Sequence, residues 1–364
     1  MAVSVVEGCF LTGSTIALIV YLLFLYTIAV NRNRQPFHSP FFALTFSLGV
    51  ADVLQLLHTY VFLRFPSFGW LTDAVYLRLS LPVVNYASCA MWGIAFTQHV
   101  FVFVLAANRC SAIVFPHNHG QRWSTKVTGA SIAISWVTGL IFITPKIFFS
   151  KEVYYRIIDN DTREATIVWG APGILRYYVY LSFGMNGTIN VLCFACYAAI
   201  FYTACHRQMT SLGRRHKLPL NKRKTTMDGL ETTVTLILSS PSQPRSPLAL
   251  LNIWQKRELK LAFCGFLIFV FMFIYGLGVG YMSIDGSPKT QDARRGVWLA
   301  TSDIFSGINP FLVLGISKSV RKCFFETITC SSGGADGASS TNTTQCKSIK
   351  EQVPRPTPDE DEQF

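Results

Sequence analysis

The sequence predicts an all-α membrane protein built as a seven-transmembrane helix bundle, and three observations carry that prediction. Half of the 364 residues are apolar and only 14% are charged, with a mean hydropathy of +0.34. A soluble domain has about 25% charged residues, so neither a water-soluble core nor a disordered chain fits this composition. Seven long runs are almost free of charge. Helices satisfy their own backbone polar groups, which lipid cannot do, so these runs predict helices.

Each of the seven runs is long enough to cross the hydrocarbon layer of a bilayer. Residues 10–30 hold no charge over 21 positions, which makes a helix about 31 Å long at about 1.5 Å per residue. The same test finds six more spans, at residues 41–63, 83–107, 127–149, 177–205, 259–282 and 297–316. The two halves of the chain do not match each other, which argues against an inverted-repeat transporter.

The distribution of Lys and Arg predicts which side of the bundle is cytoplasmic. Of the 32 basic residues, 22 fall on the side of the first, third and fifth connections and the C-terminal tail. Because the more basic side stays inside, the N-terminus is predicted outside and the C-terminus in the cytoplasm. The net charge of +12 then reflects topology and contact with anionic membrane lipids, and no nucleic acid is expected as a partner.

This topology divides the chain into one large domain and two flanking segments. Residues 1–9 form a short extracellular N-terminus, and residues 10–325 hold the seven spans with a long third inner loop at 206–258. The basic first part of that loop suits either a partner surface or lipid anchoring, and residues 225–251 resemble a flexible insertion. The tail 326–364 is rich in Ser, Thr and Gly, ends acidic, and is predicted to be disordered.

Two kinds of covalent modification are predicted from local sequence. Asn160 begins an Asn-Asp-Thr glycosylation sequon in the second outer loop, on the side where sugar is added. Cys323 and Cys330 accompany the amphipathic stretch 318–325 after the seventh span, which predicts a short eighth helix on the membrane surface. The alternatives for these two cysteines are palmitoylation and two buried small thiols.

Four motifs on four different spans resemble rhodopsin-like G-protein-coupled receptors. Residues 108–116 read Asn-Arg-Cys-Ser-Ala-Ile-Val-Phe-Pro, similar to the Asp-Arg-Tyr-x-Ala-Ile-x-x-Pro stretch of that class. Residues 48–52 resemble its second-helix Leu-Ala-x-Ala-Asp, and Trp136 its fourth-helix tryptophan. Asn309 and Pro310 resemble its Asn-Pro-x-x-Tyr motif, although a valine stands where the tyrosine would be.

The resemblance is closer to the nematode serpentine chemoreceptors of class gamma and class V. It rests on Ser-Pro-Phe-Phe at 39–42, on Pro116 and Trp123 after the Asn-Arg pair, and on Ser-Asp-Ile-Phe at 302–305. It implies a chemosensory receptor in the plasma membrane of a sensory cell, which binds a small extracellular ligand without a cofactor. The implied partner is a heterotrimeric G protein. The alternative is a ligand-gated channel or transporter with seven helices, and a structural membrane protein is a third option.

The resemblance also implies a switch at the inner end of the third span. Arg109 matches the arginine that packs inside at rest and meets the G protein in the active state, a two-state element that ligand and partner both bias. Its neighbour Asn108 carries no charge, so Glu258 at the start of the sixth span is the candidate ion-pair partner, and Asn309 and Pro310 belong to the same switch. The alternative for Arg109 is a basic residue that only sets topology.

Two acidic residues lie inside the spans, where an ionisable group needs a partner or water. The resemblance pairs Asp52 with Asn309 and with a sodium ion, and the alternative is a protonated, hydrogen-bonded core residue. Asp303 stands at the offset where opsins carry their retinal lysine, which argues against a Schiff-base photoreceptor. It either receives a cationic ligand group or bonds to a neighbouring helix.

Candidate ligand contacts gather on the outer half of the third span. They are Asn85, Tyr86, Ser88 and Trp92, with Trp298 opposite on the seventh span. Aromatic walls with a few polar groups suit a small, partly apolar ligand, whereas plain helix packing is the alternative. The sequence shows no nucleophile motif, phosphate-binding loop, paired catalytic carboxylates or three-residue metal cluster, so neither an enzyme nor a metal site other than the sodium site is predicted.

Overall fold

The computed structural model describes residues 5–34, 36–149, 153–169, 172–216, 247–282 and 288–332. Most of the segment predicted to be a flexible insertion, and nearly all of the tail predicted to be disordered, lie outside these residues. The chain divides into two compact units, residues 1–324 and residues 325–364. The first unit holds the helix bundle.

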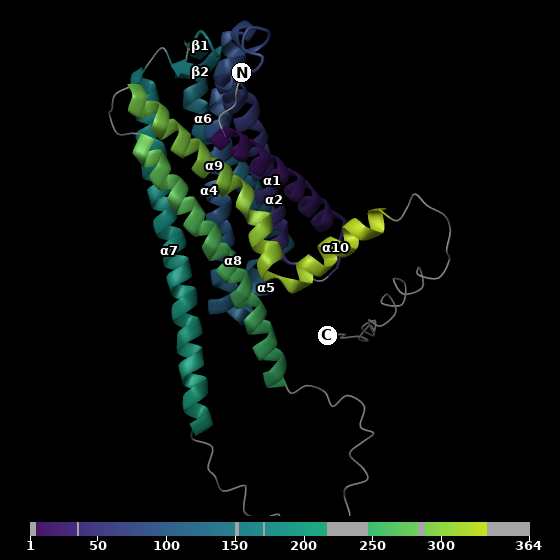
Figure 1. Cartoon of the computed structure of the whole chain (residues 1–364). Helices are drawn as coiled ribbons and strands as arrows, with labels where there is room; N and C mark the ends of the chain where they lie inside the picture. Colours follow the sequence, from purple (N-terminus) through teal and green to yellow (C-terminus); the bar gives the residue numbers. More distant parts are fainter. Residues whose placement is uncertain are drawn as a thin grey trace, which may run out of the picture. The chain divides into compact units, whose positions relative to one another are not determined.

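Seven helices of the described chain are long and apolar enough to cross a membrane, which confirms the predicted bundle. They are α1 (Val5–Val30), α2 (Pro40–Thr59), α4 (Leu81–Val114), α6 (Thr125–Phe149), α7 (Pro172–His216), α8 (Pro247–Met282) and α9 (Pro288–Ile316) (Figure 1). Helices α7 and α8 extend well beyond the predicted ends of their spans into the predicted third inner loop. Polar and charged residues continue a helix outside the membrane once its apolar part has formed.

Serine and proline mark where two of these helices begin. Ser39 precedes α2 with Pro40 in its first turn, and Ser80 precedes α4 with Pro82 in its first turn. Proline suits these positions because its missing N–H is one that the first turn leaves unbonded. At the other end, α4 stops at Val114, two residues before Pro116, which cannot continue the helix.

The second span does not end where its charge-free run ends. Helix α2 continues through a π-helical turn, η1 (Tyr60–Arg64), into the short helix α3 (Phe65–Ser67). The wider π turn changes which side chains face the bundle, and such turns occur frequently at functional sites. Here it accompanies the burial of Arg64, which is 6% exposed although it is charged and lies beyond the predicted span.

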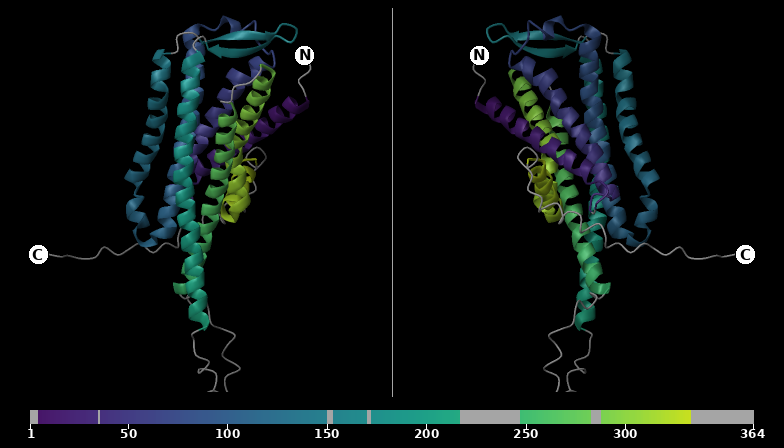
Figure 2. Two further views of the ribbon diagram at one scale, coloured as in Figure 1. Left: turned by 90° about the vertical axis from the view of Figure 1, so that its left-hand side faces the viewer. Right: turned by 90° about the vertical axis from the view of Figure 1, so that its right-hand side faces the viewer.

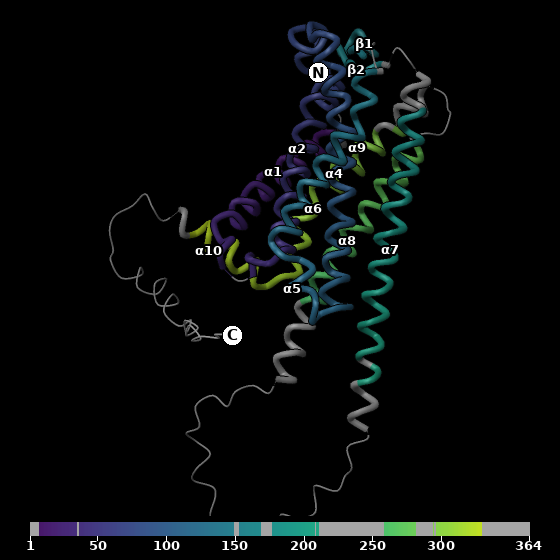
Figure 3. The backbone as a smooth tube through the Cα atoms, turned by 180° about the vertical axis from the view of Figure 1, so that it is seen from behind, coloured from purple at the N-terminus to yellow at the C-terminus, as the bar shows by residue number. Residues whose placement is uncertain are grey.

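Helix α4 is the centre of the bundle, in contact with α2, α6, α7 and α8 (Figure 3). Small residues let α6 approach it closely. A Cβ atom added at Gly139 would lie 2.0 Å from the Thr97 hydroxyl and 2.7 Å from the Gly93 carbonyl oxygen. Close approach through glycine is the usual way in which membrane helices pack, since lipid gives no hydrophobic drive for association.

A β-hairpin that the sequence analysis did not predict lies across one end of the helices (Figure 2). Strand β1 (Val153–Asp159) pairs antiparallel with β2 (Glu164–Trp169). The first strand is rich in β-branched and aromatic residues, and at the turn the Asp159 carboxylate accepts the Asp161 N–H at 2.9 Å. This end of the bundle is called the hairpin end, and the opposite end, where α4 carries Arg109, is called the Arg109 end.

The hairpin is packed onto the bundle and also tied to it by charge. Tyr155 and Val153 join a buried cluster with Tyr76 of the 3-10 helix η2 (Tyr76–Arg78). At the turn, Arg163 forms an ion pair with Asp73, and its Nε lies 2.9 Å from the carboxylate. The hydrogen bond from Arg163 holds the pKa of Asp73 below its ordinary value of 3.8. The hairpin is therefore an attached cover and not a loose loop.

The remaining helices are short. The 3-10 helix η3 (Pro116–Asn118) and α5 (His119–Arg122) connect α4 to α6 at the Arg109 end. A further helix, α10 (Lys318–Ser332), follows α9 where the sequence predicts an eighth helix. Its first turns belong to the bundle, since Val320 is fully buried and the Arg321 guanidinium donates to the Leu314 carbonyl oxygen at 3.2 Å.

Candidate functional site

A buried ion pair joins α4 and α8 at the Arg109 end. The Arg109 guanidinium contacts the Glu258 carboxylate, and the two residues are 2% and 5% exposed. Its Nε also donates to the Asn108 side-chain oxygen at 3.1 Å, and its guanidinium carbon lies 4.5 Å from the centre of the Phe41 ring. Removing one member of such a buried pair costs about 3–5 kcal/mol, because the charge that remains is buried without a partner.

A polar network inside the membrane connects four helices around Asp52. The Asp52 carboxylate accepts hydrogen bonds from the Tyr21 hydroxyl and, at 2.7 Å, from the Gln98 amide. Gln98 also donates to Ser306 at 3.1 Å, and the Asn309 amide donates to the Tyr21 hydroxyl at 3.0 Å. Asp52 and Asn309, which the resemblance pairs, are therefore members of one network with Tyr21 between them.

The sodium site that the resemblance implies stays a prediction. Both carboxylate oxygens of Asp52 accept from protein donors, whereas the Asn309 Oδ1 in the same network accepts no hydrogen bond from any described residue. In the described part of the chain, no group of three or more His, Cys, Asp or Glu side chains is arranged to hold a metal ion. Pro310, the neighbour of Asn309, lies inside α9.

A small cavity lies between α4, α7, α8 and α9 toward the hairpin end. Its lining includes two of the predicted ligand residues, Trp92 and Trp298, together with His99, Asn186 and Tyr275. The Trp298 indole N–H donates to the Tyr275 hydroxyl at 3.4 Å. The free volume is only about 10 Å³, enough for about one water molecule. This central cavity is aromatic and, in the conformation described, almost filled by its own side chains.

Sequence reasoning missed His99, Asn186 and Tyr275 because each is an isolated residue in an apolar run. Only the packing of α4, α7 and α8 brings them to one place. The hairpin reaches this region as well, because Ile167 of β2 packs against the same buried cluster of Leu63, Met91 and Leu299 as the two tryptophans.

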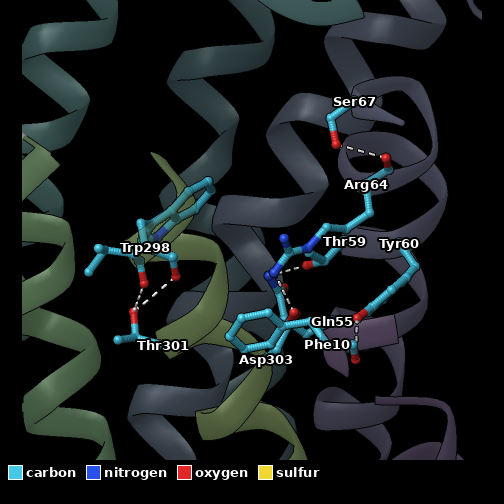
Figure 4. Close-up of polar contacts among 10 residues, drawn as sticks. Phe10, Gln55, Thr59, Tyr60, Arg64, Ser67, Trp298, Thr301 and Asp303 are labelled. Carbon is cyan, nitrogen blue, oxygen red and sulfur yellow. Dashed lines mark hydrogen bonds and ion pairs between the residues drawn. The ribbon is translucent and has the colours of Figure 1, made fainter. Parts of the chain in front are cut away.

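Asp303 does not stand open in the cavity but forms a second buried ion pair (Figure 4). Its carboxylate lies 2.7 Å from the Arg64 guanidinium, and the two residues are 5% and 6% exposed. The Arg64 guanidinium carbon also lies 5.5 Å from the centre of the Phe10 ring on α1. Of the two roles expected for Asp303, this geometry favours a bond to a neighbouring helix. The signal for Arg64 was a lone charge at the predicted end of the second span.

The other predicted ligand residues are not brought together with Trp298. Asn85 donates to the Ile147 carbonyl oxygen at 3.4 Å, and the Ser88 carbonyl oxygen accepts from Lys146 at 3.4 Å. Lys146, which the sequence analysis did not single out, is fully buried with its amine 4.7 Å from the centre of the Trp92 ring. These contacts join α4 to α6.

Tyr86 lies outside the central cavity, which corrects its expected place among the ligand contacts. Its side chain is 66% exposed on the outer face of α4. The physical reason is helical geometry, because the offset of six positions from Tyr86 to Trp92 amounts to about 240° around an α-helix. The two rings therefore point in different directions.

The predicted modification sites differ in what the structure describes. Asn160 is exposed at the turn of the hairpin, where an acceptor asparagine is accessible. Cys323 is half-buried near the start of α10, and the side chain of Cys330 lies outside the described residues.

Comparison with known proteins identifies the family. The sequence model of the family described as serpentine type 7TM GPCR chemoreceptor Srv matches residues 10–330. The chain is also similar to serpentine receptor class V-1 of Caenorhabditis elegans, with 25% identity over 315 residues that cover 85% of this chain and 86% of that protein. The match extends across all seven spans. The chain therefore belongs to the Srv family of serpentine chemoreceptors, as a multi-pass membrane receptor of the chemosensory, G-protein-coupled type.

Proposed function

We propose that this receptor binds a small ligand among the helices at the hairpin end and activates a heterotrimeric G protein at the Arg109 end, by a rhodopsin-like rearrangement of α8 against α4. The hairpin end is then extracellular and the Arg109 end cytoplasmic, in the plasma membrane of a sensory cell. The positive-inside distribution of Lys and Arg supports this orientation. The exposed sequon at Asn160 lies at the hairpin end, where it accepts sugar in this topology.

The observation that carries the proposal is the buried pair between Arg109 and Glu258. Helices α4 and α8 hold this pair at one end and line the central cavity at the other. Trp92 and Arg109 are seventeen positions apart along α4, and Glu258 and Tyr275 are seventeen positions apart along α8. At about 1.5 Å per residue, either helix connects the two places over about 25 Å. A ligand that shifts α8 at the cavity therefore biases whether the pair is closed or open.

Nucleotide exchange on a panel of G proteins tests this mechanism, with the purified receptor in lipid and with small volatile or water-soluble ligands. Glu258→Gln weakens the pair while keeping its shape, and we expect basal exchange to rise about tenfold, since about 1.4 kcal/mol of bias suffices. Arg109→Ala removes the group that faces the G protein, and we expect exchange to be lost. Lys126→Ala, an exposed basic residue on α6, is the matched control and leaves exchange unchanged.

Two results contradict the mechanism. Equal basal exchange in wild type and Glu258→Gln shows that the pair does not restrain activation. Full exchange by Arg109→Ala, at equal surface expression, reduces Arg109 to a residue that sets topology.

A further inference from the structure

Two cysteine thiols meet at the contact between α4 and α7. The cysteines whose side chains the structure describes all carry free thiols. Among them, Cys110 of α4 and Cys196 of α7 form a hydrogen bond with each other through their thiols. The two residues are far apart in the sequence, so the packing of α4 against α7 brings them together. We call them the α4–α7 thiol pair.

The α4–α7 thiol pair lies at the Arg109 end of the bundle. Cys110 directly follows Arg109 and stands four positions before Val114, the last residue of α4. Helix α4 has 34 residues and is about 51 Å long at about 1.5 Å per residue, whereas the hydrocarbon layer is about 30 Å thick. The end turns of α4 therefore reach the headgroup region, where water and small polar molecules enter.

Both thiols of the pair are half-buried, which leaves them accessible to a small molecule. Their neighbours differ in this respect. Cys193, one turn before Cys196 on α7, and Cys264 on α8 are fully buried. The oxidation of a cysteine depends on its exposure as well as on its chemistry, so the pair is the more reactive place.

Each member of the thiol pair is next in sequence to a residue that contacts α8. Tyr197, beside Cys196, is buried, and a Cβ atom added at Gly265 of α8 would lie only 2.6 Å from its hydroxyl. Arg109, beside the other thiol, forms the ion pair with Glu258 of α8. A covalent bond between the two thiols therefore acts on the place where α4, α7 and α8 meet.

We propose that Cys110 and Cys196 are a modification site, at which a peroxide such as hydrogen peroxide joins the two thiols in a reversible disulfide that restrains the Arg109 end. One sulfur attacks the peroxide, the O–O bond breaks, a sulfenic acid forms and one water leaves. The second sulfur attacks the sulfenic sulfur, the S–S bond forms and a second water leaves. The sulfurs lose two electrons in all, which the peroxide gains, and both thiol protons end in water.

The setting favours a reversible bond. Disulfides in a reducing compartment are usually transient and redox-sensing, and a thiol such as glutathione reverses them through a mixed disulfide. While the disulfide lasts, α7 cannot separate from α4 beside Arg109, so we expect G-protein activation to fall. The cytoplasmic location of this end and the effect on activation rest on the proposed function, whereas the formation of the disulfide does not.

Peptide mass spectrometry tests the site with the purified full chain in phosphatidylcholine nanodiscs, without G protein. The receptor is treated with hydrogen peroxide, remaining thiols are blocked with iodoacetamide, and the chain is digested without reductant. We expect two peptides linked through Cys110 and Cys196, which separate when dithiothreitol is added. Cys196→Ala should lose the link, and the sulfenic acid of Cys110 should then accumulate and be trapped by dimedone.

The chain offers two controls for this experiment. Cys193→Ala removes a thiol one turn away on the same helix and should keep the link. Cys205, which is exposed on α7, should react with dimedone in the wild type because its sulfenic acid persists. Oxidation of Cys110 and Cys196 without a link between them overturns the site, and so does a link from Cys110 to Cys193.

Nucleotide exchange tests the restraint, measured after catalase has removed the peroxide. Peroxide should lower exchange by the wild type, dithiothreitol should restore it, and exchange by Cys196→Ala should not change. A link that forms without any change in exchange rejects the restraint. If no G protein responds although the link forms, the coupling mechanism and the restraint fail together while the disulfide stands. Absence of the link with exchange intact rejects the site alone.

Discussion

Substituting alanine for Gly139 should separate α6 from α4, the central helix of the bundle. The added Cβ would lie 2.0 Å from the Thr97 hydroxyl, about 1.4 Å short of the 3.4 Å at which ordinary contact begins. It would also lie 2.7 Å from the Gly93 carbonyl oxygen, which belongs to the backbone and cannot rotate away. Overpacking of this kind costs about 1–3 kcal/mol, and the backbone contact places Gly139→Ala near the upper end, about 3 kcal/mol.

The measurement is the free energy of unfolding of the purified receptor, from reversible titration with a denaturing detergent in lipid bicelles. Gly129→Ala is the matched control on the same helix, since its added Cβ meets nothing within 4 Å. Combining Gly139→Ala with Thr97→Ala removes the shorter contact but leaves the carbonyl contact, so stability should recover only in part. Equal stability of Gly139→Ala and Gly129→Ala would refute the reasoning, because it would mean that the helices are not in close contact there.

Three further predictions concern the hairpin end. Arg64→Met and Asp303→Leu should each lower the free energy of unfolding by about 3–5 kcal/mol, because each leaves one buried charge without a partner. The double variant should recover much of that loss, and additive losses would show that the pair is not coupled. Because Arg163 lowers the Asp73 pKa, their contact persists at neutral pH and is lost as the pH falls through a value below 3.8. In an NMR titration, Arg163→Gln should raise the Asp73 pKa, and an unchanged pKa would exclude the contact. Asn160→Gln should remove the glycosidase-sensitive mobility shift of the receptor expressed in animal cells, and a shift that remains would place the sugar elsewhere.

The seven spans could be predicted because membrane insertion depends on local composition. An uninterrupted apolar run is a property of one segment, so its position can be read without knowing its neighbours. The hairpin was missed because its two strands, within residues 153–169, are short and are stabilised by Tyr76 and Val84 from elsewhere in the chain. The second span extends beyond the predicted end at residue 63 because Arg64 is neutralised by a residue more than two hundred positions away.

The residues of the candidate site also fall into two groups, those that the sequence indicates and those that only the packing of the helices brings together. Asp52 could be selected from sequence because a charge inside an apolar span needs a partner. Arg109 was selected through the motif that resembles rhodopsin-like receptors, and Glu258 as its candidate partner because Asn108 carries no charge. The cavity residues His99, Asn186 and Tyr275 carry no such mark, and Tyr86 was placed wrongly because facing depends on helix rotation within the bundle.

The sequence by itself determined that this protein is a membrane protein with seven helical spans, because length, charge and hydropathy are sums over neighbouring residues. The tertiary structure alone decided which of its polar groups are satisfied and which are not. It closes the Arg109–Glu258 and Arg64–Asp303 pairs and joins Tyr21, Gln98 and Asn309 to Asp52 in one network. The physical reason is that hydrogen bonds and ion pairs depend on distances of a few ångströms between segments far apart in the chain.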